Sequence, residues 1–260
     1  MTAPTDRLMP MRRLIPVVSI ALAVLVAGCG TNSDSPTAGS SASSAADPVT
    51  AIKEGMGRSL AGTVIMDASV KAGPATMELT GKMDPAAKVL TVTTTAPEEM
   101  EARLIGDAAY IKMEASGSGK PWMKIDLTKL RPESSLRQSF DLESQTGLVG
   151  GIVTAEKVGE GSYKGTADLE KAVQAAPADG GMRDGLESTA KLAKDPKAIP
   201  FEATVDAEGR VTSLSYTIAT KSLGDLVTEM KMHGFGEPVK VEAPPAGETE
   251  DAAAEMYTFL

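Results

Sequence analysis

The sequence is poor in the side chains on which most enzyme chemistry depends. Its 260 residues include one cysteine, Cys29, and one histidine, His233. A disulfide needs two cysteines, whereas metal sites and catalytic triads bring several histidine, cysteine, serine or carboxylate groups together. The chain also has no HExxH, GxSxG or glycine-rich phosphate-binding motif. We therefore expect no enzyme, no bound metal and no cofactor, and we expect His233 to lie on the surface.

Basic residues are outnumbered by acidic ones. Lysine and arginine total 26 against 35 aspartates and glutamates, which gives a net charge of −9. Residues 1–28 hold three arginines and one aspartate, so the remaining chain has 23 basic and 34 acidic side chains, a net charge of −11. Such a chain is repelled by nucleic-acid phosphates and by anionic headgroups. We expect no nucleic-acid partner, and attachment to a membrane has to come from another source.

No apolar run reaches the roughly 20 residues that a membrane-spanning helix needs. The run at residues 14–26 follows Arg7, Arg12 and Arg13 and ends in Val26-Ala27-Gly28-Cys29. Positive charge, then a short apolar run, then small residues is the order of a secretory signal peptide. The only cysteine directly after these small residues resembles the lipobox of bacterial lipoproteins, in which the cysteine is acylated and becomes residue one. An ordinary signal with a chance cysteine and an uncleaved anchor are the alternatives.

An acylated Cys29 predicts a lipid-anchored protein on the extracytoplasmic face of the cell membrane. Two or three acyl chains hold a protein at a bilayer where one chain is marginal. Residues 31–46, TNSDSPTAGSSASSAA, have no apolar period and are rich in serine, alanine and glycine. They predict a flexible tether with a reach of about 20 Å. We therefore assign residues 1–28 to the signal peptide and residues 29–46 to the lipidated cysteine and its tether.

The pattern from residue 47 onward predicts an α+β domain. Asp47-Pro48 is a helix-start signal, and a helix is expected at 48–58. Apolar and polar residues then alternate with the period of strands that have one dry and one wet face. Two helices, at 168–176 and 182–194, interrupt the strands. About ten strands are expected in one antiparallel meander. The segments that alternate are 62–70, 76–83, 88–95, 99–105, 109–113, 122–127, 152–158, 162–168, 201–206, 211–219 and 225–233, with a last edge segment after Pro238.

A sheet of this size curls, and the helices are expected to cover its concave face. We place the domain at 47–243. The remaining residues, 244–260, are rich in proline, glutamate and alanine and predict an acidic, mobile tail.

The dry strand faces supply the candidate ligand-binding residues. The same alternation is expected for a filled core and for the lining of a cavity, so the pattern leaves both open. Methionine, of which the chain has 14, suits either a core or a surface that accepts apolar partners of varied shape. Trp122 is a candidate for a ligand mouth, for the membrane interface or for the core. The candidates are Val64, Met66, Met77, Leu79, Met83, Met100, Leu104, Ile111, Met113 and Trp122.

Four segments carry a family resemblance: IGDAAYIK at 105–112, PWMKIDL at 121–127, YKGTADL at 163–169 and GFGEPVKV at 234–241. With the lipobox, tether and opening helix, they resemble the actinobacterial LppX/LprA/LprF/LprG lipoproteins, relatives of the LolA-type half-barrels. The resemblance covers most of residues 48–243. It implies a half-barrel whose helices enclose an apolar cavity for acyl chains, and relatives that carry or bind acylated glycolipids during cell-envelope assembly.

Two functions follow from these observations. The first is a membrane-anchored lipoprotein that binds or carries lipid or glycolipid acyl chains in an apolar cavity. The second is a partner-binding or envelope-sensing lipoprotein with a filled core and no lipid cargo, in which an exposed face or the acidic tail docks an envelope protein.

Overall fold

The computed structural model describes residues 47–259 except 97–98, 113–118, 133, 135, 138–139, 141–146, 179–180 and 223. The chain separates into two compact units, Met1–Ser43 and Ser44–Leu260, and the description below concerns the second unit. The predicted signal peptide, Cys29 and the tether lie outside the described residues, as does the candidate Met113.

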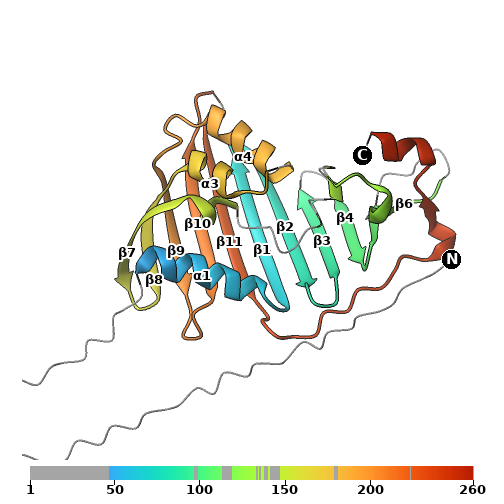
Figure 1. The fold of residues 1–260 in the computed structure, drawn as a ribbon, viewed down its shortest axis with the longest axis horizontal. Helices are drawn as coiled ribbons and strands as arrows, with labels where there is room; N and C mark the ends of the chain where they lie inside the picture. The colour runs from blue at the N-terminus through green and yellow to red at the C-terminus, as the bar shows by residue number, and fades with distance from the viewer. Residues whose placement is uncertain are drawn as a thin grey trace, which may run out of the picture. The chain divides into compact units, whose positions relative to one another are not determined.

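One large sheet dominates the described part of the chain (Figure 1). It has twelve strands in the order β12-β6-β5-β4-β3-β2-β1-β11-β10-β9-β8-β7 and is open, with β12 and β7 at its edges. The strands are β1 (Val64–Ala72), β2 (Ala75–Asp84), β3 (Val89–Ala96), β4 (Met100–Ile105), β5 (Ala108–Lys112), β6 (Trp122–Asp126), β7 (Ile152–Gly159), β8 (Ser162–Ala167), β9 (Ile199–Val205), β10 (Val211–Ala219), β11 (Asp225–His233) and β12 (Thr249–Asp251).

Two antiparallel meanders join to make this sheet. Strands β1–β6 form one and β7–β11 the other, and antiparallel pairing of β1 with β11 connects them. The last strand, β12, pairs with β6 in parallel. The expected antiparallel sheet of about ten strands is therefore corrected to a mixed sheet of twelve. The edge strand expected soon after Pro238 is instead β12, whose three residues are too few to produce an alternation signal.

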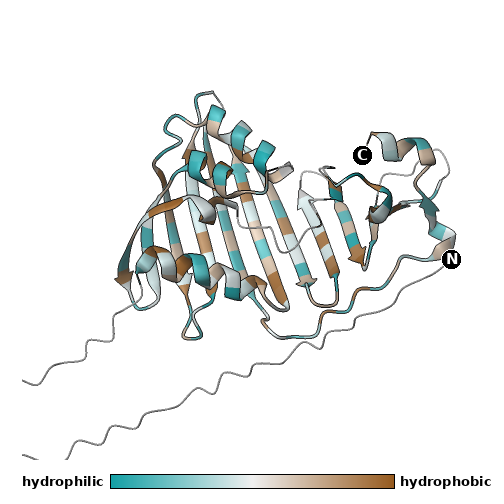
Figure 2. Ribbon diagram, in the orientation of Figure 1, coloured by the Kyte–Doolittle hydropathy of each residue, from teal (hydrophilic) through white to brown (hydrophobic). Residues whose placement is uncertain are grey.

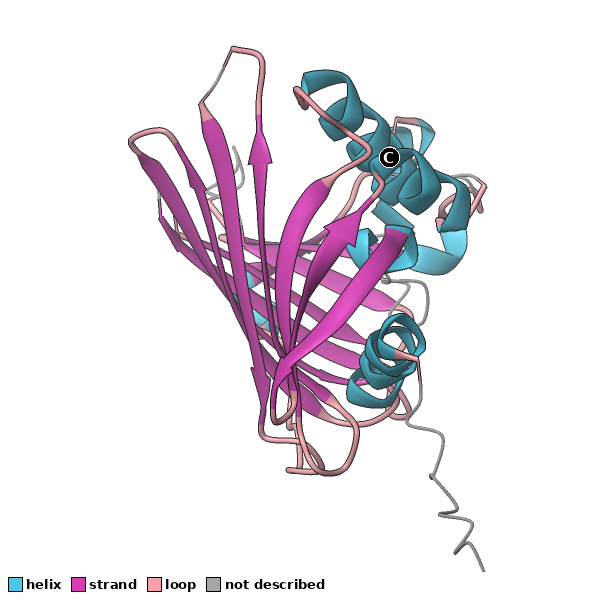
Figure 3. Ribbon diagram, turned by 90° about the vertical axis from the view of Figure 1, so that its left-hand side faces the viewer, coloured by secondary structure: helices cyan, strands magenta, loops and turns pink. Residues whose placement is uncertain are grey.

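Three α-helices of the described residues lie on one side of the sheet (Figures 1 and 3). They are α1 (Pro48–Leu60), α3 (Leu169–Ala175) and α4 (Gly181–Leu192), and the short 3₁₀ turn η2 (Gly147–Gly151) contacts all three. A second 3₁₀ turn, η1 (Leu127–Lys129), follows β6. The Asp47 carboxylate accepts a hydrogen bond from the amide of Thr50, and Pro48 opens the first turn. Asp168 caps α3 in the same way. The helix starts predicted at Asp47 and Asp168 are confirmed.

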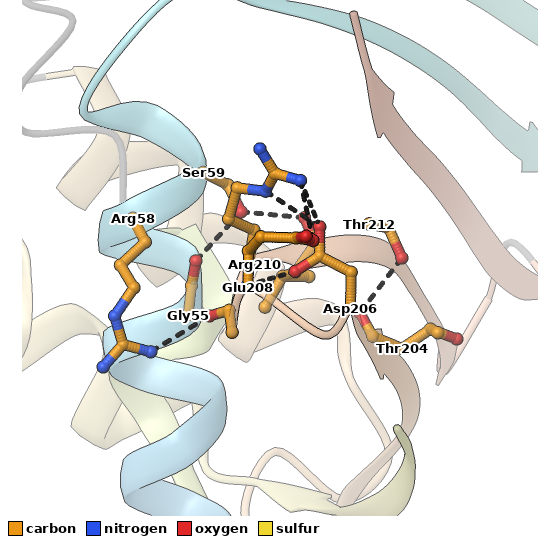
Figure 4. Close-up of polar contacts among 10 residues, drawn as sticks. Gly55, Arg58, Ser59, Thr204, Asp206, Glu208, Arg210 and Thr212 are labelled. Atoms are coloured by element: carbon orange, nitrogen blue, oxygen red, sulfur yellow. Dashed lines mark hydrogen bonds and ion pairs between the residues drawn. The ribbon is translucent and has the colours of Figure 1, made fainter. Parts of the chain in front are cut away.

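Helix α1 is held against the start of β10 by close backbone approach and by polar contacts (Figure 4). A Cβ atom on Gly55 would lie 3.0 Å from the carbonyl oxygen of Gly209, so glycine permits this approach. The buried Ser59 hydroxyl donates to the carbonyl of Val211 at 2.8 Å, and Arg58 donates to the carbonyl of Gly209 at 3.0 Å. Ile52, on the same helix, is fully buried. These contacts fix α1 across one end of the sheet.

The chain after β11 also folds against the sheet, which corrects the expected mobile tail and the domain boundary at residue 243. It forms η3 (Ala246–Glu248), β12 and η4 (Ala254–Thr258). The Lys120 ammonium donates to the carbonyl of Thr249, and the Tyr257 hydroxyl accepts the Asp126 amide at 3.0 Å. Backbone pairing with β6, which needs no particular side chain, orders a segment whose composition is typical of a mobile one.

Candidate functional site

The two faces of the sheet differ in polarity, and the helix side is apolar. Directly opposed residues of an antiparallel pair point to the same face, so the strand register defines rows of side chains that cross the sheet. Figure 2 shows apolar and polar residues alternating along the strands. On the helix side of β1–β6 this register produces four rows, which we number from the end of the sheet where α1 lies.

Row 1 is a filled core. Its six residues come from six neighbouring strands, and none is more than 8 % exposed. They lie at the start of β1, β3 and β5 and at the end of β2, β4 and β6, near the β2–β3 and β4–β5 turns. The members of row 1 are Val64, Met83, Leu90, Leu104, Ala109 and Ile125.

Cover decreases from row 1 toward the opposite end of the strands. Row 2 is partly exposed apart from a buried glycine, and it consists of Met66, Gly81, Val92, Ala102, Ile111 and Met123. Row 3 consists of Ala68, Leu79, the buried Thr94 and Met100, which is 46 % exposed. Row 4 consists of Val70 and Met77, which is 40 % exposed. The apolar face is therefore closed at one end and half open at the other, toward the β1–β2 turn.

Methionine is the main large side chain of the half-open rows. Met66, Met77, Met100 and Met123 all lie there, and Met230 of β11 extends row 3 beyond Ala68. A thioether on a flexible unbranched stem adapts to irregular apolar surfaces. This part of the face can bind a flexible apolar chain, but it offers no reactive group.

The structure divides the ten predicted site residues into four groups. Met66, Met77, Leu79, Met100 and Ile111 line the half-open rows. Val64, Met83 and Leu104 lie in the closed row 1, where they form core rather than a ligand surface. Met113 is outside the described residues. Trp122 lies on the other face of the sheet.

Trp122 is only 5 % exposed, although it points away from the helices. It pairs with Lys112, and the Arg103 guanidinium lies over its ring at 4.7 Å from the centroid. Arg103 is held by Glu101 at 2.7 Å and by the carbonyl of Glu242 at 2.8 Å. The expectation that Trp122 lines the apolar site is therefore wrong. Trp122 directly precedes Met123 in β6, and neighbouring residues of a strand point to opposite faces of the sheet.

The polar face carries a hollow of about 730 Å³ over β7–β11. Most of its lining side chains point away from the helices, among them Glu156, Lys164, Glu202, Ser215 and Glu229. A hydrogen bond from Lys164 to Glu156 at 2.9 Å raises the pKa of the Lys164 ammonium. The charge of this lining does not suit an acyl chain.

The remaining chemistry of the described residues is sparse. His233 lies on the polar face and contacts Asp67 at 2.9 Å, and both side chains are about half exposed, so the predicted surface position is confirmed. Hydrogen bonds from His233 and Thr80 lower the pKa of Asp67. Within the described ranges no group of three histidine, cysteine or acidic side chains could hold a metal. No described helix has the length and apolar character needed to cross a bilayer.

Comparisons with known proteins leave the family resemblance a prediction. No family model matches the chain, and no curated protein matches it. Among solved structures, an uncharacterized conserved protein from Thermus thermophilus is similar over 76 % of this chain and 96 % of its own, with 9 % identity and a TM-score of 0.38. MucB in complex with MucA(peri) is similar over 75 % of this chain and 58 % of its own, with 9 % identity and a TM-score of 0.34.

Two features of the site were missed by sequence reasoning. Gly81 leaves row 2 without a side chain at its position. The available sequence signal was the presence of a glycine within a strand of alternating apolar and polar residues. Arg183 lies on the buried side of α4. The sequence signal for this position was its helical spacing, three residues before Leu186 and seven before Ala190.

Proposed function

We propose that this protein is a lipoprotein, anchored through Cys29 on the extracytoplasmic face of the cell membrane, which binds acyl chains of a lipid or glycolipid for cell-envelope assembly. The half-open rows of the apolar face are the binding surface, and row 1 is its floor. The observation that carries the proposal is that the exposed fraction of the apolar side chains increases from row 1 to row 4. The predicted lipobox and the resemblance to LolA-like half-barrel lipoproteins support it.

The apolar character of this surface provides a driving force for binding an acyl chain. Burial of apolar surface contributes about 25 cal/mol per Å², or about 0.8 kcal/mol for each methylene group. The exposed methionines Met77 and Met100 would lose their contact with water when a chain lies on them. Binding by this route needs no covalent chemistry and no charge on the chain.

A partner-binding lipoprotein without lipid cargo is the second candidate. The filled row 1 favours it, because a closed core in one of the four rows leaves less room for a chain. In this case the half-open rows would contact an apolar surface of an envelope protein.

Lipid analysis separates the two candidates. The chain from residue 30 onward, purified without detergent from the soluble fraction of a host cell, should release lipid on organic extraction and show lipid-bound masses in native mass spectrometry. Protein that is lipid-free in both measurements, and takes up no acyl chain on incubation with vesicles, would contradict lipid carriage. In the full chain, Cys29→Ala should move the protein from the membrane to the soluble fraction, which tests the anchor independently.

A further inference from the structure

Arg183, in the first turn of α4, has one unsatisfied hydrogen-bond donor. Its Nε atom is buried and has no hydrogen-bond partner. Neither Asp184 nor Glu187, the acidic residues nearest to it on the helix, forms an ion pair with it, and no other described residue does so. A buried donor without an acceptor carries a desolvation cost that a ligand can offset.

Arg183 lies on the side of α4 that turns toward the sheet. Leu186 and Ala190, three and seven residues further on, pack against the core cluster, and this spacing places Arg183 close to the same helix face. The arginine is partly buried, as are Leu186 and Ala190. Its buried Nε atom therefore lies on the side of the helix that turns toward the apolar layer.

Helix α4 lies at the half-open end of the sheet. After the helix, Ala193 forms a β-bridge with Thr220, which directly follows the last residue of β10. That end of β10 pairs with the start of β11, and Leu226 near this start pairs with Ala72, the last residue of β1. The β1–β2 turn, toward which rows 3 and 4 open, is at the same end. In Figure 1 the N-terminal end of α4 extends from the bridge in the direction of β1 and β2.

We propose that Arg183 binds the anionic group of an amphiphile whose acyl chain lies on the half-open rows. This inference rests on the proposed function and adds the substrate class: a single-chain or multi-chain lipid with a carboxylate or phosphate group near the start of its chain. A guanidinium binds either oxyanion with paired, charge-assisted hydrogen bonds. The chemistry shared by the two groups is a planar or tetrahedral oxyanion attached to an apolar chain.

A matched set of ten-carbon ligands tests the inference by isothermal titration calorimetry on the chain from residue 30 onward. This chain retains every described residue. Decanoate and decyl phosphate carry the oxyanion, decanol has the same chain without charge, and inorganic phosphate has the charge without the chain. We expect each anionic amphiphile to bind about tenfold or more tightly than decanol, as for a hydrogen bond to a charged group. The ratio between decanoate and decyl phosphate identifies the preferred oxyanion.

Three variants locate the effect. Arg183→Met should remove the preference for the anions and leave decanol binding unchanged, whereas Arg183→Lys should retain part of the preference. Lys191→Met removes an equal charge from the exposed side of the same helix and should keep the wild-type ratio. Because Arg183 is unpaired, the ligand-free Arg183→Met protein should melt at the wild-type temperature or above, whereas loss of a structural ion pair would lower it.

The outcomes that overturn the inference differ from those that overturn the proposed function. Equal affinity for decanol and the anions, an unchanged ratio in Arg183→Met, or comparable binding of inorganic phosphate alone would refute the role of Arg183. Absence of binding for all three ten-carbon ligands would refute acyl binding itself.

Discussion

Met66 on β1 and Gly81 on β2 lie directly opposite each other on the helix side of the sheet. Gly81 therefore leaves a gap in row 2 between Met66 and Val92. A Cβ atom on Gly81 would meet nothing closer than the Thr91 carbonyl oxygen at 3.8 Å, so the backbone there does not require glycine. The gap is a property of the apolar face and not of a tight turn.

Filling this gap should reduce acyl binding without unfolding the protein. In Gly81→Leu the new side chain occupies the space between Met66 and Val92, and the loss of a strand glycine offsets part of any packing strain. We expect a fall in lipid bound per protein in native mass spectrometry, with a melting temperature close to wild type. Lys82→Leu adds the same side chain one residue further on, on the polar face, and should bind lipid as wild type does. Equal lipid content in both variants would contradict the placement of the site.

The attachment of α1 predicts opposite effects for two nearby glycines. Gly55→Ala places a Cβ atom 3.0 Å from the Gly209 carbonyl oxygen and 3.3 Å from a Val211 methyl group, and should destabilise the protein by about 1–3 kcal/mol. Gly57→Ala meets nothing within 4 Å and should stabilise it by about 0.5–1 kcal/mol, because alanine is the better helix former. Urea unfolding measures both. Destabilisation by the two variants alike would contradict the close approach at Gly55.

A hydrogen bond between α1 and β10 can be tested separately. Ser59→Ala removes the donor to the Val211 carbonyl, which is made in a buried position. We expect a loss of about 1–2 kcal/mol in the free energy of unfolding. Thr50→Ala, in the exposed first turn of the same helix, loses only a hydroxyl contact with Asp47 and should cost less.

The contacts of Asp206 with Arg210 in the β9–β10 hairpin lead us to expect a loss of stability in acid. Burial pushes the pKa of Asp206 upward, but hydrogen bonds from the Arg210 backbone and side chain outweigh it, and the pKa falls below its ordinary value of 3.8. A lowered folded-state pKa adds stability that is fully present above the ordinary value and is lost as the pH falls through the folded pKa. Asp206→Asn should therefore be less stable at pH 7 and should lose less stability below pH 4.

Thermal unfolding across this pH range checks the prediction. Asp225→Asn changes an exposed aspartate at the start of β11 and should retain the wild-type slope. An unaltered slope in Asp206→Asn would show that other carboxylates cause the acid loss.

Removal of the C-terminal segment should change the self-association of the protein. Deletion of residues 244–260 removes β12 and exposes the backbone edge of β6, which is then free to pair with another chain. We expect a lower melting temperature and concentration-dependent oligomers by sedimentation velocity. Phe259→Ala, at a side chain that is 89 % exposed, should remain like the wild type. A monomeric truncated protein with wild-type stability would contradict a structural role for β12.

Most strands and the three α-helices of the described residues could be predicted from the sequence. Alternation along β1 and β2 indicated which residues share a face, and Asp47-Pro48 and Asp168 indicated where helices begin. The three-residue β12 could not be predicted, because its order comes from backbone pairing with β6 and not from its side chains. Trp122 shows the limit for single residues, since a shift of one position transfers a strand residue to the opposite face.

The sequence by itself determined the apolar identity of the helix-side face, because side chains in a strand point alternately to its two sides. Only the tertiary structure decided that Val64 and Leu104 are core while Met77 and Met100 are open, and that Arg183 lacks a carboxylate. The physical reason is that cover depends on which segment lies above a residue. Here the pairing of β1 with β11 joins the two meanders and brings α1 to one end and α4 to the other, and no local pattern specifies that pairing.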